Sequence, residues 1–159
     1  MSPRVLLPLF TPLVVAWGLW QRARVMRRGT PLSARQRAIA VAVGVAQPER
    51  IRLQLVKRVP IPGGAWSNGV ARRIGIAGSD VDGLTLGHAI LIRRAAASDD
   101  LLAHECRHVQ QCEAAGSLRA FLAAYLRQVA QHGYRQAPFE VDARDAARRW
   151  MHADRRAPR

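Results

Sequence analysis

Lysine is almost absent from this sequence of 159 residues. Lys57 is the only lysine among the 25 basic residues, so the net charge of +14 comes almost entirely from arginine. This imbalance indicates a compositional bias along the chain rather than a phosphate-binding surface, and no basic run is interleaved with aromatic residues. Nucleic acid is therefore not an expected partner.

Cysteine is also scarce, and only Cys106 and Cys112 are present. Both fall in a segment that we predict to be one helix, on different faces and about 9 Å apart along its axis. They cannot pair with each other, so no disulfide framework points to secretion and a reducing, cytoplasmic compartment is favoured. The length of the chain suits one globular domain.

Acidic residues are missing from the first 48 positions, which contain seven arginines. Residues 5–20 carry no charge and end in Trp17 and Trp20, and arginines follow at once at positions 22, 24, 27 and 28. This order is typical of an aromatic belt with a basic flank on the cytoplasmic side of a membrane.

The same segment is short for a membrane span. Its sixteen residues make a helix of only about 24 Å against a hydrocarbon core of about 30 Å, and Pro8 and Pro12 are expected to interrupt it. Residues 1–29 are therefore interpreted in two ways. They either anchor the chain to a membrane or form a hydrophobic arm packed on the surface of a domain comprising residues 30–159.

Beyond residue 30 the chain has the patterns of a mixed α and β domain. Ser33 can cap a helix whose apolar residues recur at helical spacing up to Gly44. Residues 51–55 alternate between apolar and polar and predict a half-buried strand, and a second strand is predicted at residues 89–93.

Three helices are predicted in the second half of the chain. Ser98, followed by two aspartates, suits the N-cap of a helix over residues 99–115. An amphipathic helix over residues 117–132 ends at Gly133, and Pro138 suits the first position of a third helix. The expected fold class is α+β, mainly helical, with a short β-sheet preceding the first of these helices.

The first of these helices contains LLAHECRHVQQCE, in which His104, Glu105 and His108 form the pattern H-E-x-x-H. Residues four apart share a helix face, so both histidines can direct a ring nitrogen to one ion about 2.1 Å away, with Glu105 beside them. Zinc held in this way lowers the pKa of a bound water, and the carboxylate can accept its proton during attack on a carbonyl. The alternative is a surface helix that carries two histidines by chance.

A catalytic zinc site needs a third ligand, and Glu140 is the candidate. Gln111 and Ala114 occupy the glycine and histidine positions of the extended pattern, and Cys112 lies about 9 Å too far along the helix. If the helix over residues 117–132 returns antiparallel to the motif helix, the next helix starts level with His104, and Glu140 lies in its first turn.

The combination of H-E-x-x-H with a glutamate on a later helix resembles the gluzincin class of zinc metallopeptidases. The run GLTLGHAILIRRAAASDDLLAHECRHVQQCEAAGS is similar to small zincin-like domains of uncharacterised function, in which a strand leads into the motif helix. The similarity covers residues 33–150 and is most specific from Gly83 to Asp142. It implies a small zincin-like domain in which His104, His108 and Glu140 are the zinc ligands. It also implies that Glu105 is the general base.

The two variable positions inside the H-E-x-x-H motif depart from the pattern of active zincins. Cys106 occupies a position that is often small or aliphatic, and Arg107 places a cation beside a ligand. For the second N–H of a ligating histidine, Asp142 or Asp145 is the expected acceptor, unless these aspartates pair with Arg144 and Arg148 instead.

Tyr134 and His132 lie in the connection that must pass the site, where a phenol or an imidazole could stabilise the oxyanion of a tetrahedral intermediate. Tyr134 is the residue that we assign to this catalytic role, and the alternative is that it simply caps the core. Structural or surface roles are expected for His88 and His152.

The expected function is that of a zinc-dependent metallopeptidase that binds a peptide or protein substrate along the edge of the strand at residues 89–93. The alternative is a non-catalytic module that binds zinc or associates with a membrane. Glu105 favours catalysis, because a purely structural site has no use for a carboxylate there. The expected location is cytoplasmic, with residues 5–20 as the anchor if that segment inserts into a membrane.

Overall fold

The computed structural model describes residues 3–62 and 81–156, which form a mainly helical α+β fold with a small sheet. The predicted class, α+β and mainly helical, is thereby confirmed. In chain order the helices and strands are α1 (Pro3–Arg28), β1 (Thr30–Pro31), α2 (Ala34–Ala42), β2 (Arg52–Val56), β3 (Gly83–Leu86), β4 (Ala89–Arg93), α4 (Asp99–Ala114), α5 (Leu118–His132) and α6 (Pro138–Arg156). Short 3-10 turns lie at Pro48–Arg50 (η1), Arg94–Ala96 (η3) and Tyr134–Gln136 (η4).

The described strands form one sheet in the order β1-β2-β4-β3. β4 pairs in parallel with β2 and antiparallel with β3, so that Ile90 lies opposite Leu53 on one side and Thr85 on the other. The expectation that a peptide could bind along the edge of β4 is therefore wrong, because both of its edges are already paired. In the described part of the sheet, β3 is the edge strand beside β4.

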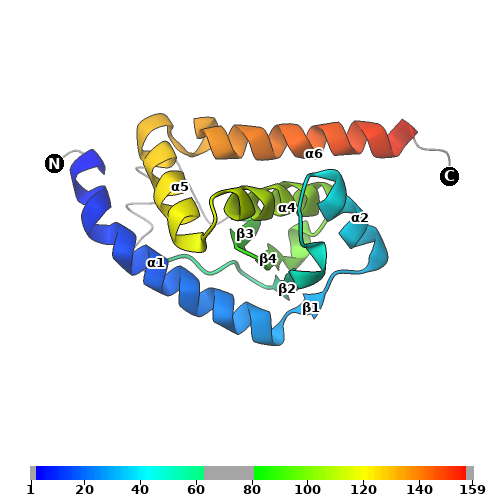
Figure 1. The fold of residues 1–159 in the computed structure, drawn as a ribbon, viewed down its shortest axis with the longest axis horizontal. Coiled ribbons are helices and arrows are strands. Elements are labelled where there is room, and N and C mark those ends of the chain that lie inside the picture. The colour runs from blue at the N-terminus through cyan, green and yellow to red at the C-terminus, as the bar shows by residue number, and fades with distance from the viewer. Residues whose placement is uncertain (1–2, 63–80, 157–159) are drawn as a thin grey trace.

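Side chains of β4 alternate between two hydrophobic clusters, one on each face of the sheet. Ile90 and Ile92 pack with residues of α2 and α4, whereas Ala89 and Leu91 pack with residues of α1 and α5. Figure 1 shows the corresponding layers, with α6 above α4, and α1 running along the opposite side of the molecule. A strand buried on both faces has a continuous apolar sequence, as AILI has here.

Helix α1 runs without a break from Pro3 to Arg28, so the expected interruption at Pro8 and Pro12 is wrong. Val15 and Val25 are buried in the cluster shared with α5 and the sheet. This packing over several turns outweighs the hydrogen bond that each proline removes. Among residues 3–62 and 81–156, no helix has the length and apolar character that a membrane crossing requires.

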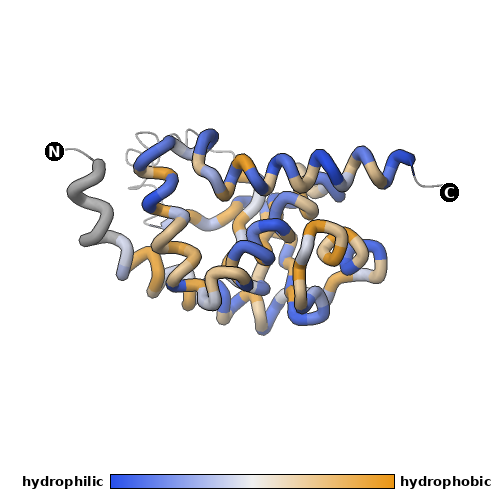
Figure 2. The backbone as a smooth tube through the Cα atoms, turned by 45° about the horizontal axis from the view of Figure 1, so that its top comes forward, coloured by the Kyte–Doolittle hydropathy of each residue, from blue (hydrophilic) through white to orange (hydrophobic). Residues whose placement is uncertain are grey.

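Local signals account for the starts of the other helices. Ser33 and Gln36 form a reciprocal capping box at α2, and the Ser98 side chain accepts the N–H of Leu101 at α4. Pro138 is the first residue of α6, as predicted. Figure 2 shows that hydrophilic positions dominate the outer helix α6.

The path between α4 and α6 differs from the expected one. Figure 1 shows that α5 crosses the directions of α4 and α6 steeply, rather than returning antiparallel to α4. The reason is that the apolar face of α5, which includes Phe121 and Leu122, packs in one cluster with α1. It is α6 that lies along α4, and this places its first turn over the H-E-x-x-H motif.

Candidate metal centre

Three predicted ligands converge between α4 and the first turn of α6. His104 and His108 face each other with 3.1 Å between their Nε2 atoms. Oε2 of Glu140 lies 3.4 Å from Nε2 of His104, and Oε1 lies 3.3 Å from Nε2 of His108. These residues form a group that could hold a metal ion.

The distances within this group fit a common ion. Two donors at about 2.1 Å from a tetrahedrally coordinated zinc lie about 3.4 Å apart, close to the separations observed here. Oε2 of Glu140 is buried and has no hydrogen bond of good geometry among the described residues, although Nε2 of His104 lies 3.4 Å away and Nη1 of Arg144 lies 3.8 Å away. Because a buried carboxylate oxygen that lacks a full hydrogen bond is costly, a cation between Glu140 and the two histidines would satisfy this atom. The residues present therefore fit a zinc ion.

The charges in the group also suit a cation. Burial raises the pKa of Glu140, but hydrogen bonds from His104 and His108 in their protonated forms, together with their positive charges, outweigh it and hold this pKa well below the usual range. Burial lowers the pKa of His108, but the hydrogen bond with Glu140 and the charges of Glu105 and Glu140 outweigh it and raise this pKa. Glu140 is therefore ionised at neutral pH, in the form that ligates a metal.

The ring of His108 is oriented by Gln111, a residue whose role the sequence analysis missed. Nδ1 of His108 lies 2.8 Å from Oε1 of Gln111, whose amide group donates to Asp142 and to the carbonyl of Phe139. Since Oε1 of Gln111 can only accept, Nδ1 of His108 carries the proton. When the ring is neutral, the lone pair of Nε2 is therefore directed toward His104 and Glu140, as metal ligation requires.

The two aspartates considered as partners of the histidines have different roles. Asp142 accepts from Gln111 at 2.8 Å and from Arg107 at 2.7 Å, so it acts on His108 only through Gln111. The ion pair between Asp142 and Arg107 also neutralises the positive charge that Arg107 places beside the ligands. Asp145 pairs with Arg148 on the surface of α6, which is the alternative considered for it.

Glu105 is buried beside the ligands and is held by the edge strand β3. The hydroxyl of Thr85 donates to Oε2 of Glu105 at 2.7 Å. A Cβ added to Gly83 would collide with the carboxylate of Glu105, so only glycine lets the strand approach so closely. The strand thus fixes the carboxylate of Glu105 through contacts that involve none of the three candidate ligands.

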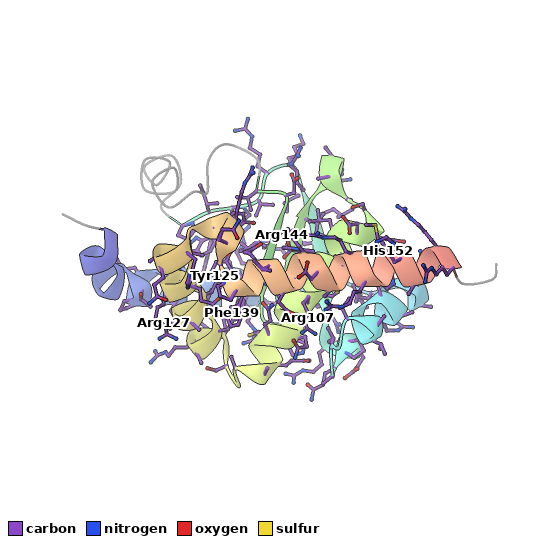
Figure 3. All side chains as sticks on the ribbon, turned by 90° about the horizontal axis from the view of Figure 1, so that it is seen from above. Arg107, Tyr125, Arg127, Phe139, Arg144 and His152 are labelled. Carbon is purple, nitrogen blue, oxygen red and sulfur yellow. The ribbon has the colours of Figure 1, made fainter. Side chains whose placement is uncertain are left out.

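Two tyrosines lie near the carboxylate of Glu140. Tyr125 of α5 donates its hydroxyl to Oε1 of Glu140 at 2.7 Å, and Figure 3 places it with Phe139 where α5 meets the start of α6. Tyr125 lies on the apolar face of α5, where a partly buried phenol needs a hydrogen-bond partner. Burial, with the charges of Glu140 and Glu105, raises the pKa of Tyr134 in η4, so its hydroxyl stays protonated. His132, the other candidate, is exposed at the end of α5.

The remaining candidates lie outside the ligand group. Cys106 and Cys112 are buried and unpaired, and burial raises the pKa of Cys106 to about 12, so it remains a thiol. His88 pairs with Glu113 at 2.9 Å, a structural contact between the β3–β4 turn and α4. His152 is exposed on α6. Both histidines thus occupy the structural and surface positions expected for them.

Comparisons of the chain with protein-family models, with curated proteins and with solved structures found no match. The function of the site is therefore argued from its own residues and their geometry.

Proposed function

We propose that this protein is a zinc-dependent metallopeptidase with a small zincin-like domain. The observation that carries the proposal is the convergence of His104, His108 and Glu140 at separations that suit one zinc ion, with Glu105 fixed beside them. Three protein ligands leave a fourth position open for water or substrate, as in catalytic rather than structural zinc sites. The side chain of His104 remains 15% exposed, so the group is reachable from solvent.

Zinc in this site would supply Lewis-acid polarisation and a water of lowered pKa. Glu105 accepts the proton of the attacking water as the new carbon–oxygen bond forms. It then donates this proton to the amide nitrogen as the carbon–nitrogen bond breaks, which yields a carboxylic acid and an amine. Thr85 keeps the carboxylate of Glu105 in one orientation throughout. Tyr134, which retains its proton, is the proposed donor to the oxyanion that develops on the carbonyl.

The substrate that suits this arrangement is an extended peptide lying along β3. This strand is the edge of the described sheet, and it also carries Gly83 and Thr85, which hold the base. A peptide that adds to such an edge gains backbone hydrogen bonds irrespective of its sequence. Its scissile bond then lies near the proposed base and ligands.

The test compares the wild-type chain with Glu105→Gln for zinc content by mass spectrometry and for cleavage of a diverse peptide library. Glutamine is nearly isosteric and still accepts the hydrogen bond from Thr85, so the variant keeps its fold and its zinc. Turnover should fall by at least about a hundredfold, the usual scale for a lost general base. Asp100→Asn, at an exposed position of the same helix, is the control and should cleave like the wild type.

Two results would contradict this function. Equal cleavage by the wild type and Glu105→Gln at matched zinc content would show that Glu105 is not the base. A wild type that holds one zinc per chain but cleaves no peptide would instead identify the group as a non-catalytic metal site.

A further inference from the structure

The outward face of α1 combines exposed apolar side chains with arginines. Leu13 is 66% exposed and Trp20 is 54% exposed, and their spacing of seven residues places them on one side of the helix. Arg24 and Arg27 continue the same side over the next two turns, and the guanidinium of Arg24 lies 4.9 Å from the ring centroid of Trp20. We call these four residues the outer stripe of α1.

The opposite side of α1 is occupied by the domain itself. Val15 and Val25 are buried in the cluster with α5 and the sheet. A Cβ added to Gly18 would lie 3.1 Å from Cδ1 of Leu122, which shows how closely α1 and α5 pack. The helix therefore lies flat on the domain, and only the outer stripe and its flanks face outward.

We propose that the outer stripe docks on the surface of an anionic lipid bilayer, with α1 lying in the plane of the interface. Leu13 inserts among the acyl chains, and Trp20 occupies the level of the headgroups, where tryptophan is enriched. Arg24 and Arg27 contact the anionic headgroups. The proposal is independent of the metallopeptidase function, because it uses none of the residues of the metal centre.

Charge decides between a lipid surface and a second copy of the chain. The first 48 residues contain no acidic side chain, and the whole chain carries a net charge of +14, so an anionic surface is complementary. Two copies that met through this stripe in a symmetric dimer would bring their own arginines together. An anionic bilayer is therefore the occupant that fits.

The test is co-sedimentation of the full-length protein with vesicles of phosphatidylcholine, either alone or mixed with phosphatidylserine. The wild type should sediment with the vesicles that contain phosphatidylserine, and added salt should weaken the binding. Leu13→Glu combined with Trp20→Glu should lower the partition coefficient at least about tenfold, because it removes the inserted groups and adds repelled charges. Neutralising Arg24 and Arg27 with glutamine should cost about fivefold for each arginine.

Val41→Glu is the matched control, because Val41 is an apolar residue of α2 that is 59% exposed and lies outside the outer stripe. It should bind vesicles like the wild type. Circular dichroism and thermal unfolding check that all variants are folded, and the arginine variants keep the test decisive if the glutamate pair unfolds. The proposal is overturned if the wild type ignores vesicles that contain phosphatidylserine, or if folded stripe variants bind them as the wild type does. It is also overturned if sedimentation velocity shows a dimer that the glutamate pair abolishes while no vesicle binds.

Discussion

Oε1 of Gln111 lies 2.8 Å from Nδ1 of His108, one turn further along α4. The same side chain donates to Asp142, whose carboxylate is also held by Arg107. This chain of contacts joins His108, a candidate ligand on α4, to the helix that carries Glu140. It fixes both the tautomer of His108 and the direction of its ring, so the ligand needs no reorganisation to bind a metal.

Replacing Gln111 with leucine should therefore weaken zinc binding without removing any ligand. The expected loss of affinity is about 10- to 100-fold, the usual effect of removing a group that orients a metal-bound histidine. Competition with a chromophoric chelator measures this affinity. Asp145→Ala serves as the control, because Asp145 pairs only with Arg148 among the described residues and should bind zinc like the wild type. An unchanged affinity in Gln111→Leu would contradict the orienting role.

The second prediction concerns the hold of β3 on Glu105. Thr85→Val keeps the shape of the side chain but removes the hydroxyl that donates to Oε2 of Glu105. Turnover should fall by about tenfold or more, because a hydrogen bond to a charged group is worth about 1.5–3 kcal/mol. Zinc content should not change, since Thr85 contacts none of the ligands. The peptide-cleavage assay with metal analysis measures both quantities.

Two further variants separate positioning from general destabilisation. Thr85→Ser retains a hydroxyl and should recover most of the activity. Gly83→Ala should be the more harmful change, because the new methyl group would displace the carboxylate of Glu105. If Thr85→Val cleaves as fast as the wild type, the contact with Glu105 has no part in turnover.

Local sequence patterns were sufficient to predict the two helices that carry the candidate ligands, but not the strand β3. The Ser98 cap, the spacing of His104 and His108, and the proline that starts α6 all act within a turn or two of helix. The prediction that Glu140 joins the histidines was correct, although the expected antiparallel path of α5 was not. Glu140 still reaches the histidines because α6, rather than α5, runs along α4. The first turn of α6, which contains Glu140, therefore lies over the two histidines.

The groups that tune the site could not be predicted in the same way. Thr85 meets Glu105 across the contact between a strand and a helix, and this contact depends on how the sheet is placed against α4. Tyr125 meets Glu140 only because α5 crosses steeply, which follows from its packing with α1. Gln111 is different, because it lies three residues from His108 on the same helix and could have been recognised from spacing alone.

The third prediction distinguishes the two tyrosines near Glu140. Tyr134→Phe should lower the turnover number by about a hundredfold, the scale for a lost oxyanion donor, while zinc affinity stays close to that of the wild type. Tyr125→Phe should instead weaken zinc binding, because it removes the hydrogen bond that orients the ligand Glu140. Steady-state kinetics at saturating zinc and chelator competition measure the two effects. A loss of turnover in Tyr125→Phe and not in Tyr134→Phe would reverse the assignment.

The last prediction concerns pH and rests on the opposite pKa shifts of Glu140 and His108. The lowered pKa of Glu140 contributes stability that is present above the ordinary glutamate value of 4.5 and is lost as the pH falls toward the lowered pKa. The raised pKa of His108 contributes stability that is present below the ordinary histidine value of 6.5 and is lost as the pH rises through the raised pKa. Without metal, both contributions are complete only between these two values.

With zinc bound, the stability of the fold should instead rise with pH above pH 6.5. Only neutral imidazoles ligate a metal, and a rising pH removes the competing protons. We therefore expect the free energy of unfolding of chelator-treated protein, relative to Glu140→Ala, to be greatest between pH 4.5 and 6.5. The stabilisation added by zinc should increase from pH 6 toward pH 8. The upper end of this range lies about one unit or more above the ordinary histidine pKa, so the imidazoles are then mostly neutral. Urea unfolding of both proteins across this range, with chelator and with zinc, measures both trends. Because the comparison with Glu140→Ala cancels titrations elsewhere in the chain, a flat difference without metal would show that the pair of Glu140 and His108 does not stabilise the fold.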